Sequence, residues 1–324
     1  TVGLGFGYLH AKILNKNKNT KLVYICDKKK KYKKFAKVFK CNFTNKFEDI
    51  VNNKLINLVT IASYDNYHFD QVSSCIKAKK NIFVEKPFCQ TELEYKKIKK
   101  LIKNKKIHFS TNFVLRNHPK FLKIKDLLKK NKIGKIYHIE GDYNYGRLEK
   151  LTQGWRGKIP YYSVTQGGGI HLIDVMIWLT KSFPKEVFAF GNKFSSINSN
   201  FKFNDNVVSL ISFKNGVTGK VSSNFGSVMP HDHHMKIFGT KGSLILSNNN
   251  LEFFTSRDPQ KKVIKMSFSK KKDYKEKILN EFIEDIVKKK NNKFISNKEI
   301  FASMKTCFAI DQSLQQGKKI KVII

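Results

Sequence analysis

Residues 2–10 read VGLGFGYLH, and the organisation of the first half of the chain follows from this stretch. Gly3, Gly5 and Gly7 come directly after an apolar start, and a helical pattern begins at Tyr8. Glycines at a strand-to-helix turn let backbone N–H groups approach a pyrophosphate, which the helix N-terminus then stabilises. The reading from Gly5 meets His10 in place of a third glycine, so the stretch alone does not identify a nucleotide site.

An acidic residue at the end of the next strand strengthens this interpretation. Residues 21–27 (KLVYICD) form an apolar run that ends at Asp27, 20 residues after Gly7. A carboxylate at this point accepts both hydroxyls of an adenosine ribose, which favours NAD. The lysines at 28–31 can instead receive a 2′-phosphate, so NADP is possible. The alternative is a plain tight turn with Asp27 as a cap.

Alternating strands and helices continue to about residue 115. The run 55–62 (LINLVTIA) is almost wholly apolar, as expected of a strand buried on both faces. Strands spaced by helices imply a parallel, doubly wound sheet. We expect residues 2–7 to be the end of a strand that runs into the glycine-rich turn. Further strands are expected over 21–27, 55–62, 81–85 and 107–113, and helices over 8–14, 31–39, 68–78 and 91–103.

Polar turns follow two of these strands. Residues 62–68 (ASYDNYH) follow one strand, and Glu85-Lys86-Pro87 ends the next. The carboxyl ends of parallel strands meet at one edge, where a dinucleotide binds; a simple helix cap by Asp65 or Asn66 is the alternative. Our candidate cofactor-binding residues are Gly3, Gly5, Phe6, Gly7, Tyr8, Asp27, Ala62, Ser63, Tyr64, His68, Glu85 and Lys86.

The second half has a different pattern and predicts an α+β domain over residues 116–324. Short alternating runs separated by turns such as Lys214-Asn215-Gly216 indicate antiparallel hairpins. We expect strands over 136–145, 185–194, 206–213, 218–225, 235–239, 243–246, 251–255 and 263–266, and helices over 119–130, 167–179, 274–289 and 298–315.

The net charge of +38 is the most conspicuous feature of the composition. Only four of the 63 basic residues are arginine, and Lys, Asn, Ile and Phe are all abundant, as codon bias in an AT-rich genome would produce. Nucleic-acid proteins more often concentrate charge on one face and use arginine. We therefore expect no physiological nucleic-acid partner, although the charge favours acidic small molecules.

Other compositional features narrow the class of protein. No stretch approaches the roughly 18 apolar residues of a membrane helix, so no membrane span is expected. Five scattered cysteines fit a reducing compartment, and we expect a cytoplasmic protein. The segment His231-Asp232-His233-His234 suggests a metal site, but no second ligand cluster accompanies it, so no metal is expected.

Taken in order, these motifs resemble the Gfo/Idh/MocA family of oxidoreductases along essentially the whole chain. The resemblance rests on the glycine turn, Asp27, the 62–68 turn, Glu85-Lys86-Pro87, Asn112 with Arg116 and Pro119, residues 133–136 (IGKI), and residues 167–174 (GGGIHLID). It implies an N-terminal Rossmann domain, a substrate-binding C-terminal domain, and a homodimer or homotetramer. It also implies that Lys86 positions substrate and that the Lys86–Pro87 peptide is often cis.

Two residues are candidate catalytic groups. Alcohol oxidation removes a hydride from carbon and a proton from oxygen, so a side chain must take the proton. Burial beside a positive nicotinamide would lower the pKa of Lys86 and suit it as base or hydroxyl orienter. His171 opens an apolar helix after a flexible glycine triplet, and Asp174 can orient it one turn later. The aspartate that many family members carry four residues before this histidine is absent, because Gly167 stands there.

The remaining candidate residues would bind substrate. Arg116, with Asn112, stands near the domain junction and can clamp a substrate carboxylate or phosphate, or an interdomain carboxylate. The segment 154–166 is rich in groups that stack on sugars or bind hydroxyls. The candidate substrate-binding residues are Asn112, Arg116, Trp155, Arg156, Tyr162, Gln166 and Asp174.

The sequence therefore predicts an NAD(P)-dependent oxidoreductase that acts on a secondary alcohol of a sugar, nucleotide sugar or cyclic polyol. Two alternatives stay open: a non-catalytic dinucleotide-binding regulator with the same fold, and a polyanion-binding accessory protein driven by charge.

Overall fold

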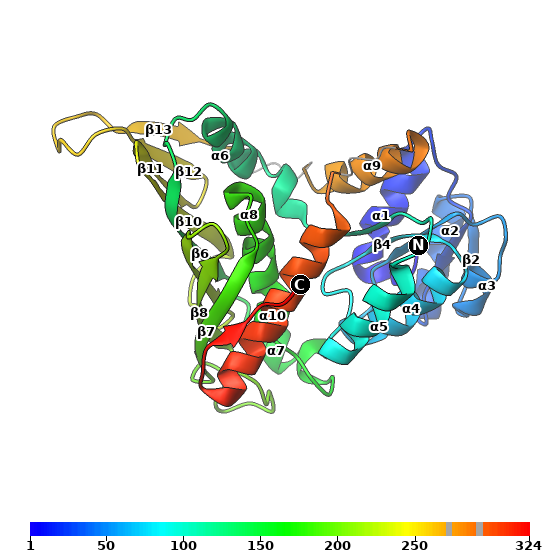
Figure 1. Cartoon of the computed structure of the whole chain (residues 1–324). Helices are drawn as coiled ribbons and strands as arrows, with labels where there is room; N and C mark the ends of the chain where they lie inside the picture. Colours follow the sequence, from blue (N-terminus) through cyan, green and yellow to red (C-terminus); the bar gives the residue numbers. More distant parts are fainter. Residues whose placement is uncertain (270–273, 290–293) are drawn as a thin grey trace. The chain divides into compact units, whose positions relative to one another are not determined.

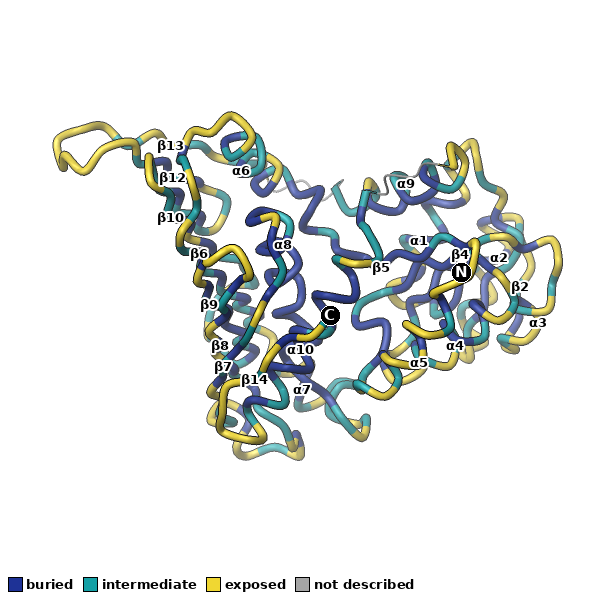
Figure 2. The backbone as a smooth tube through the Cα atoms, viewed as in Figure 1, coloured by how far each residue is buried: buried dark blue, intermediate teal, exposed yellow. Residues whose placement is uncertain are grey.

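The computed structural model describes residues 1–269, 274–289 and 294–324, which form two units (Figure 1 and Figure 2). The first unit comprises Thr1–Phe113 and Lys275–Ile300, and the second comprises Val114–Tyr274 and Phe301–Ile324. The sequence predicts two domains that meet at one boundary after residue 115, and the structure differs from this prediction in one respect. The segment 275–300 belongs to the first unit, although it follows most of the second in sequence.

The first unit is built on a parallel sheet. Strand β1 (Tyr24–Cys26) pairs with β2 (Asn42–Thr44), and β3 (Leu58–Ile61), β4 (Asn81–Val84) and β5 (Phe109–Thr111) pair in that order. Val2 bridges Cys26 on one side and Ile61 on the other, both in parallel. The resulting order is β2-β1-Val2-β3-β4-β5, with all strands parallel. Successive strands are added on one side of Val2 up to β2, and on its other side from β3 onward. The predicted Rossmann sheet is confirmed.

Helices of the first unit begin where the sequence supplies a local reason. Helix α5 (Glu92–Ile102) starts at a capping box, in which Thr91 and Glu94 satisfy each other's backbone N–H groups. Helix α1 (Leu4–Lys16) begins four residues earlier than predicted, because Gly3 caps it in a left-handed conformation. The other helices of the unit are α2 (Lys33–Val38), α3 (Glu48–Val51), α4 (Asp65–Lys77) and α9 (Tyr274–Val287).

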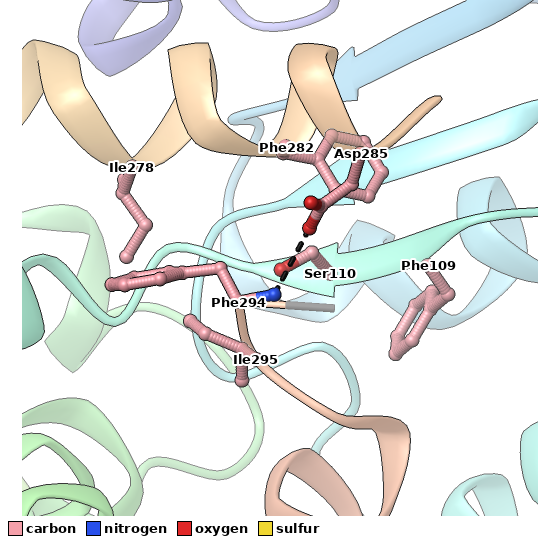
Figure 3. Close-up of a pocket in the computed structure, with 7 residues that line it drawn as sticks. All are labelled: Phe109, Ser110, Ile278, Phe282, Asp285, Phe294 and Ile295. Atoms are coloured by element: carbon pink, nitrogen blue, oxygen red, sulfur yellow. Dashed lines mark hydrogen bonds between the residues drawn. The ribbon is translucent and has the colours of Figure 1, made fainter. Parts of the chain in front are cut away.

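Aromatic packing explains why segment 275–300 belongs to the first unit. Phe282 of α9 lies on Phe83 of β4, with ring centroids 5.6 Å apart. The same helix meets β5 around a pocket of about 10 Å³ (Figure 3), which holds about one water molecule. At its rim the carboxylate of Asp285 accepts a hydrogen bond from the Phe294 backbone N–H at 3.0 Å. This pocket is a small packing gap between α9, β5 and residues 294–295, and it is too small for an organic ligand.

The second unit contains a nine-stranded sheet in the order β13-β12-β11-β10-β6-β9-β8-β7-β14. All its pairings are antiparallel except β6 with β9, so the predicted antiparallel sheet is confirmed. The strands are β6 (Ile136–Asn144), β7 (Pro184–Asn192), β8 (Asn206–Phe213), β9 (Thr218–Asn224), β10 (Asp232–Gly239), β11 (Gly242–Ser247), β12 (Asn250–Phe254), β13 (Ile264–Ser267) and β14 (Ile320–Lys321).

Helices cover one face of this sheet (Figure 1). They are α6 (Pro119–Lys129), α8 (Ile170–Thr180) and α10 (Asn297–Gln316), and the short α7 (Glu149–Thr152) follows β6. In the described part of this unit no helix covers the opposite face, where Phe190 and Leu210 are 70% and 58% exposed. None of the helices in the described residues is long and apolar enough to cross a membrane.

Candidate functional site

The glycine turn of the first unit is shaped by close contacts. Gly3 has φ 79°, and a Cβ there would lie 2.5 Å from the Ser63 backbone nitrogen, so only glycine fits. A Cβ on Gly7 would lie 2.9 Å from the Thr1 side chain. A Cβ on Gly5, by contrast, would meet nothing within 4 Å. The turn therefore leaves open space beside the N-terminus of α1, which suits a pyrophosphate.

Asp27 lies at the end of β1 and contacts this turn. Its carboxylate accepts hydrogen bonds from the backbone N–H groups of Leu4 at 2.6 Å and Lys29 at 2.8 Å. Asp27 thus ties the end of β1 to the first residue of α1. Two lysines stand next to it: Lys28 lies over the Tyr67 ring at 4.3 Å, and a hydrogen bond with Tyr64 raises the pKa of Lys29.

A buried polar cluster surrounds Glu85 at the end of β4. Its carboxylate accepts a hydrogen bond from the Asn112 amide at 2.6 Å and lies 3.3 Å from His10 Nε2. Burial alone would raise the pKa of Glu85, but the hydrogen bonds from His10 and Asn112 and the charge of Lys86 outweigh it and lower the pKa. The Lys86–Pro87 peptide is cis, as the resemblance implied. The cluster fixes the backbone on which Lys86 stands.

His68 joins the two polar turns of this sheet edge. Its ring is fully buried, with Nδ1 at 2.6 Å from the Pro87 carbonyl oxygen and Nε2 at 3.1 Å from the Ser63 carbonyl oxygen. Ser63 in turn donates a hydrogen bond from its hydroxyl to Gln71 at 2.6 Å. His68 therefore holds the turn after β3 against the Glu85–Pro87 loop, which is a supporting position.

The glycine triplet of the second unit is helical and buried, so the expectation of a flexible segment is wrong. Thr165–Gly169 form a π-helical turn that continues into α8. Side chains of other residues already occupy the space that a Cβ on these glycines would need. A Cβ on Gly167 would lie 2.0 Å from the Tyr162 hydroxyl, and one on Gly168 would lie 2.4 Å from the Tyr143 ring. An aspartate four residues before His171 therefore has no room, because the Tyr162 phenol occupies that space.

The structure pairs Arg116 with Asp174. Arg116 Nε and Nη2 donate to the two carboxylate oxygens of Asp174 at 2.9 and 2.7 Å, and both side chains are buried, at 1% and 0% exposure. A bidentate pair of this kind gives each carboxylate oxygen a charged hydrogen-bond donor. The structure thus shows Arg116 and Asp174 as a buried ion pair within the second unit. The roles of Asp174 beside His171, and of both residues in substrate binding, stay predictions.

An aromatic cluster surrounds Tyr143 of β6. The ring of His171 stacks with it at 6.3 Å, and His231 and His233 approach it at 5.1 Å each. Burial, with the positive charges of His231 and Lys120, lowers the pKa of His233 well below its usual value. The sequence motif considered as a metal site is thus packed beside His171. Among the described residues, no group of three or more His, Cys, Asp or Glu side chains is placed to hold a metal ion.

A buried carboxylate organises the segment before the glycine triplet. Asp311 of α10 accepts hydrogen bonds from Tyr161 Oη at 3.0 Å, Ser163 Oγ at 2.8 Å and Gln166 Nε2 at 2.9 Å. Burial raises the pKa of Asp311 to about 6, against these hydrogen bonds. Beside this segment, Arg156 donates to the Tyr162 hydroxyl at 3.0 Å and lies 4.7 Å from the Trp155 ring.

Comparison with known families agrees with this geometry. Residues 1–113 match an oxidoreductase family with an NAD-binding Rossmann fold, and residues 121–245 match the GFO/IDH/MocA C-terminal domain. The chain belongs to the Gfo/Idh/MocA family. That membership assigns the first unit to an oxidoreductase family with an NAD-binding Rossmann fold.

Individual members of the Gfo/Idh/MocA family are distant from this chain. It is 26% identical over 182 residues to the uncharacterized oxidoreductase YhhX of Escherichia coli, which covers 54% of this chain and 52% of that protein. The chain thus matches about half the length of this relative. It is 22% identical over 207 residues to myo-inositol 2-dehydrogenase of Thermotoga maritima, covering 62% of this chain and 59% of that protein.

Solved structures share the Gfo/Idh/MocA fold along the whole chain. A levoglucosan dehydrogenase in complex with NADH and levoglucosan has a TM-score of 0.87 at 19% identity and covers 99% of this chain and 98% of its own. Scyllo-inositol dehydrogenase from Lactobacillus casei, with NAD(H) and scyllo-inositol bound, has a TM-score of 0.82 at 19% identity, covering 99% and 97%. At this identity the likeness shows the fold alone.

Three features of this Gfo/Idh/MocA chain were not predicted from the sequence: the role of His10, the role of Asp311, and the contact between His231 and Tyr143. His10 was noted only as a break in the glycine pattern, yet it contacts Glu85 and packs edge-on against Phe83 at 5.3 Å. Its place near the start of the predicted helix over 8–14 was the available signal. Asp311 lies more than 140 residues from its partners, and no local pattern announces it. The closeness of His231 to Tyr143 depends on the pairing of β10 with β6, which the sequence does not specify.

Proposed function

We propose that this oxidoreductase transfers a hydride between a nicotinamide and a secondary alcohol of a sugar, nucleotide sugar or cyclic polyol. The observation that carries the proposal lies in the first unit. The glycine turn, Asp27 and the Glu85–Lys86 step all stand at the carboxyl ends of neighbouring parallel strands. In doubly wound sheets this edge is where dinucleotides bind.

The chain's own residues fit a bound NAD(P). The open space at Gly5 and the N-terminus of α1 suit the pyrophosphate, and Asp27 suits the adenosine ribose. Lys28 and Lys29 beside Asp27 also suit a 2′-phosphate, so NADP is the alternative cofactor of this proposal. When bound, the nicotinamide supplies the hydride acceptor or donor. We place Phe6, Tyr8, Ala62, Ser63, Tyr64 and Lys86 in the same cofactor site.

We propose two side chains, Lys86 and His171, for transfer of the proton of the substrate hydroxyl. In alcohol oxidation the O–H proton must leave as the C–H hydride departs, and Lys86 is proposed to hold the hydroxyl and accept this proton. The Glu85 cluster supports that role, because it fixes the adjacent residue by contacts with His10 and Asn112. His171 is proposed as the second proton-transfer group. Trp155, Arg156, Tyr162 and Gln166 are proposed to line the substrate site.

The assembly and the compartment are part of the same proposal. The face of the sheet that carries Phe190 and Leu210 is proposed to be covered by a second copy in a homodimer or homotetramer, because exposed apolar faces of sheets favour association. The five cysteines are free thiols, which agrees with the proposed cytoplasmic location.

The test is a titration of NADH and of NADPH into the purified protein, followed by nicotinamide fluorescence. Micromolar NADH binding, and turnover with members of a panel of polyols and nucleotide sugars, would support the proposal. A Lys86→Met variant should keep cofactor binding and lose turnover. Cofactor binding without turnover on any substrate would instead favour a dinucleotide-binding regulator. No binding of either dinucleotide at millimolar concentration would refute the cofactor site.

A further inference from the structure

A surface groove of about 910 Å³ lies between α4 and α5, two neighbouring helices of the first unit (Figure 1). Volumes of this size suit small organic ligands. The lining residues recur at helical spacing along each helix, so each set forms one face. They are Phe69, Asp70, Ser73, Ser74 and Lys77 from α4, and Lys97, Lys100, Leu101, Asn104 and Lys105 from α5 and the residues after it.

The groove is separate from the edge of the sheet where a dinucleotide would bind. Helices that join parallel strands run back from the carboxyl ends of the strands toward their amino ends. α4 follows β3 and α5 follows β4 in this way. The lining residues begin at Phe69 in the second turn of α4 and at Lys97 in the middle of α5, and they continue past the end of α5 at Ile102. The groove therefore lies toward the amino ends of the strands.

Lysine is concentrated in this groove. Four of its ten lining residues are lysines, compared with 59 of 324 residues in the chain. All four are exposed, and within the described residues neither they nor Asp70, the one acidic lining residue, forms an ion pair. At the other end of α5, Glu92 pairs with Lys96 and Glu94 caps the helix. Four ammonium groups against one carboxylate attract anions.

Helix dipoles account for only part of this set of lysines. Lys77 and Lys100 lie in the last turns of α4 and α5, where a positive charge also balances the negative end of the helix dipole. Lys97 lies earlier in α5, and Lys105 lies three residues beyond its end. Lys97 Nζ stands over the Phe69 ring at 5.9 Å, so this ammonium group lies against an apolar wall of the groove.

A buried hydroxyl in the wall of the groove has no partner. Ser73 is 8% exposed, and its Oγ makes no hydrogen bond within the part of the chain that the structure describes. Hydroxyls inside helices can donate to the carbonyl four residues earlier, as Thr180 and Thr306 do here at 2.7 Å each. A buried hydroxyl without any hydrogen bond is destabilising and calls for an oxygen from outside the chain. Ser73 can supply a donor to such an oxygen.

We propose that this groove is a second ligand site of the first unit, which binds a small organic molecule carrying at least two phosphate groups. The lysine ammonium groups hold the phosphates as point charges, and Ser73 Oγ donates to a phosphate oxygen. Phe69 and Leu101 contact the organic part, since the volume of the groove exceeds what a bare phosphate fills. The site goes beyond the proposed oxidoreductase function and does not depend on it.

The experiment is calorimetric titration at about 150 mM salt, where attraction between distant exposed charges is screened. ADP and fructose 1,6-bisphosphate are compared with adenosine and fructose, so that nucleotide and sugar bodies are separated. We expect at least one phosphorylated probe to bind at least tenfold more tightly than its counterpart. Lys97→Gln/Lys100→Gln should weaken that probe at least tenfold. Lys99→Gln/Lys103→Gln is the matched control, because it removes two exposed lysines at the same end of α5 that do not line the groove, and it should leave the affinity unchanged.

Ser73→Ala gives a second measurement. It removes no hydrogen bond from the free protein, so the Tm should not fall, whereas the phosphorylated probe should bind more weakly. The inference is overturned if neither phosphorylated probe binds better than its counterpart, or if Ser73→Ala binds the probe as the unaltered protein does. Equal affinities in the two double variants also overturn it, because they would mark attraction by overall charge or binding elsewhere. NADH binding is titrated separately on the same variants, and its failure would count against the oxidoreductase function alone.

Discussion

Removal of the Asp174 carboxylate should destabilise the second unit strongly. Asp174→Ala leaves the Arg116 guanidinium buried at 1% exposure without the two oxygens that accept its hydrogen bonds at 2.9 and 2.7 Å. Breaking a buried pair by removing one partner costs about 3–5 kcal/mol. We expect a loss of that size in the free energy of unfolding, since the buried guanidinium loses both carboxylate acceptors.

The assay is urea unfolding followed by circular dichroism, with NADH binding as a separate readout of the first unit. Asp126→Ala is the matched control, because Asp126 pairs with Lys130 on an exposed face and should give no measurable change. The double variant Arg116→Met/Asp174→Leu should recover most of the lost stability, since it removes both charges. An Asp174→Ala protein as stable as the control, but with weakened substrate binding, would refute the structural role and restore the substrate-ligand interpretation.

Three further predictions follow from other positions. Gly3→Ala should abolish NADH binding, because its Cβ would lie 2.5 Å from the Ser63 backbone, whereas Gly317→Ala, also at positive φ but in open space, should bind NADH normally. The raised pKa of Asp311, about 6, means that its contribution to stability is fully present below pH 4 and is lost as the pH rises through 6; Asp311→Asn should flatten this part of a stability profile measured by thermal unfolding. Leu210→Glu should shift the sedimentation coefficient toward that of a monomer; an unchanged coefficient would show that this exposed face is not the contact between copies.

The fold was predictable to the extent that its signals are local. The period of the apolar residues and the caps located the longer elements, and the strand at 206–213 matches β8 in full. The short elements β2, α3, α7 and β14 were not predicted. The start of α1 was missed because a glycine run was interpreted as a loop, whereas only Gly3 adopts the turn conformation. The position of α9 was missed for a different reason. Its packing on Phe83 is a contact between residues almost 200 positions apart.

The candidate site was also predictable only where its residues are close together in the sequence. Glu85-Lys86-Pro87 was recognisable because three unusual residues are adjacent after a buried strand. The use of Arg116 was left open between a ligand and a carboxylate, and no sequence pattern indicated Asp174 as its partner rather than as a neighbour of His171. The glycine triplet was correctly singled out, but the reason for it lies in Tyr143, Tyr162 and Ser223, which fill the positions of the missing side chains.

The assignment of 275–300 to the first unit has a consequence for how the protein is made. The chain passes from the first unit to the second after Phe113, returns at Lys275, and leaves again after Ile300. A ribosome must therefore synthesise residues 114–274 before α9 can cover Phe83. The sheet edge with the glycine turn is translated before these residues and is completed only after them. Folding of the nascent chain cannot run domain by domain from the N-terminus, and a gene fragment ending at residue 113 encodes an unfinished core.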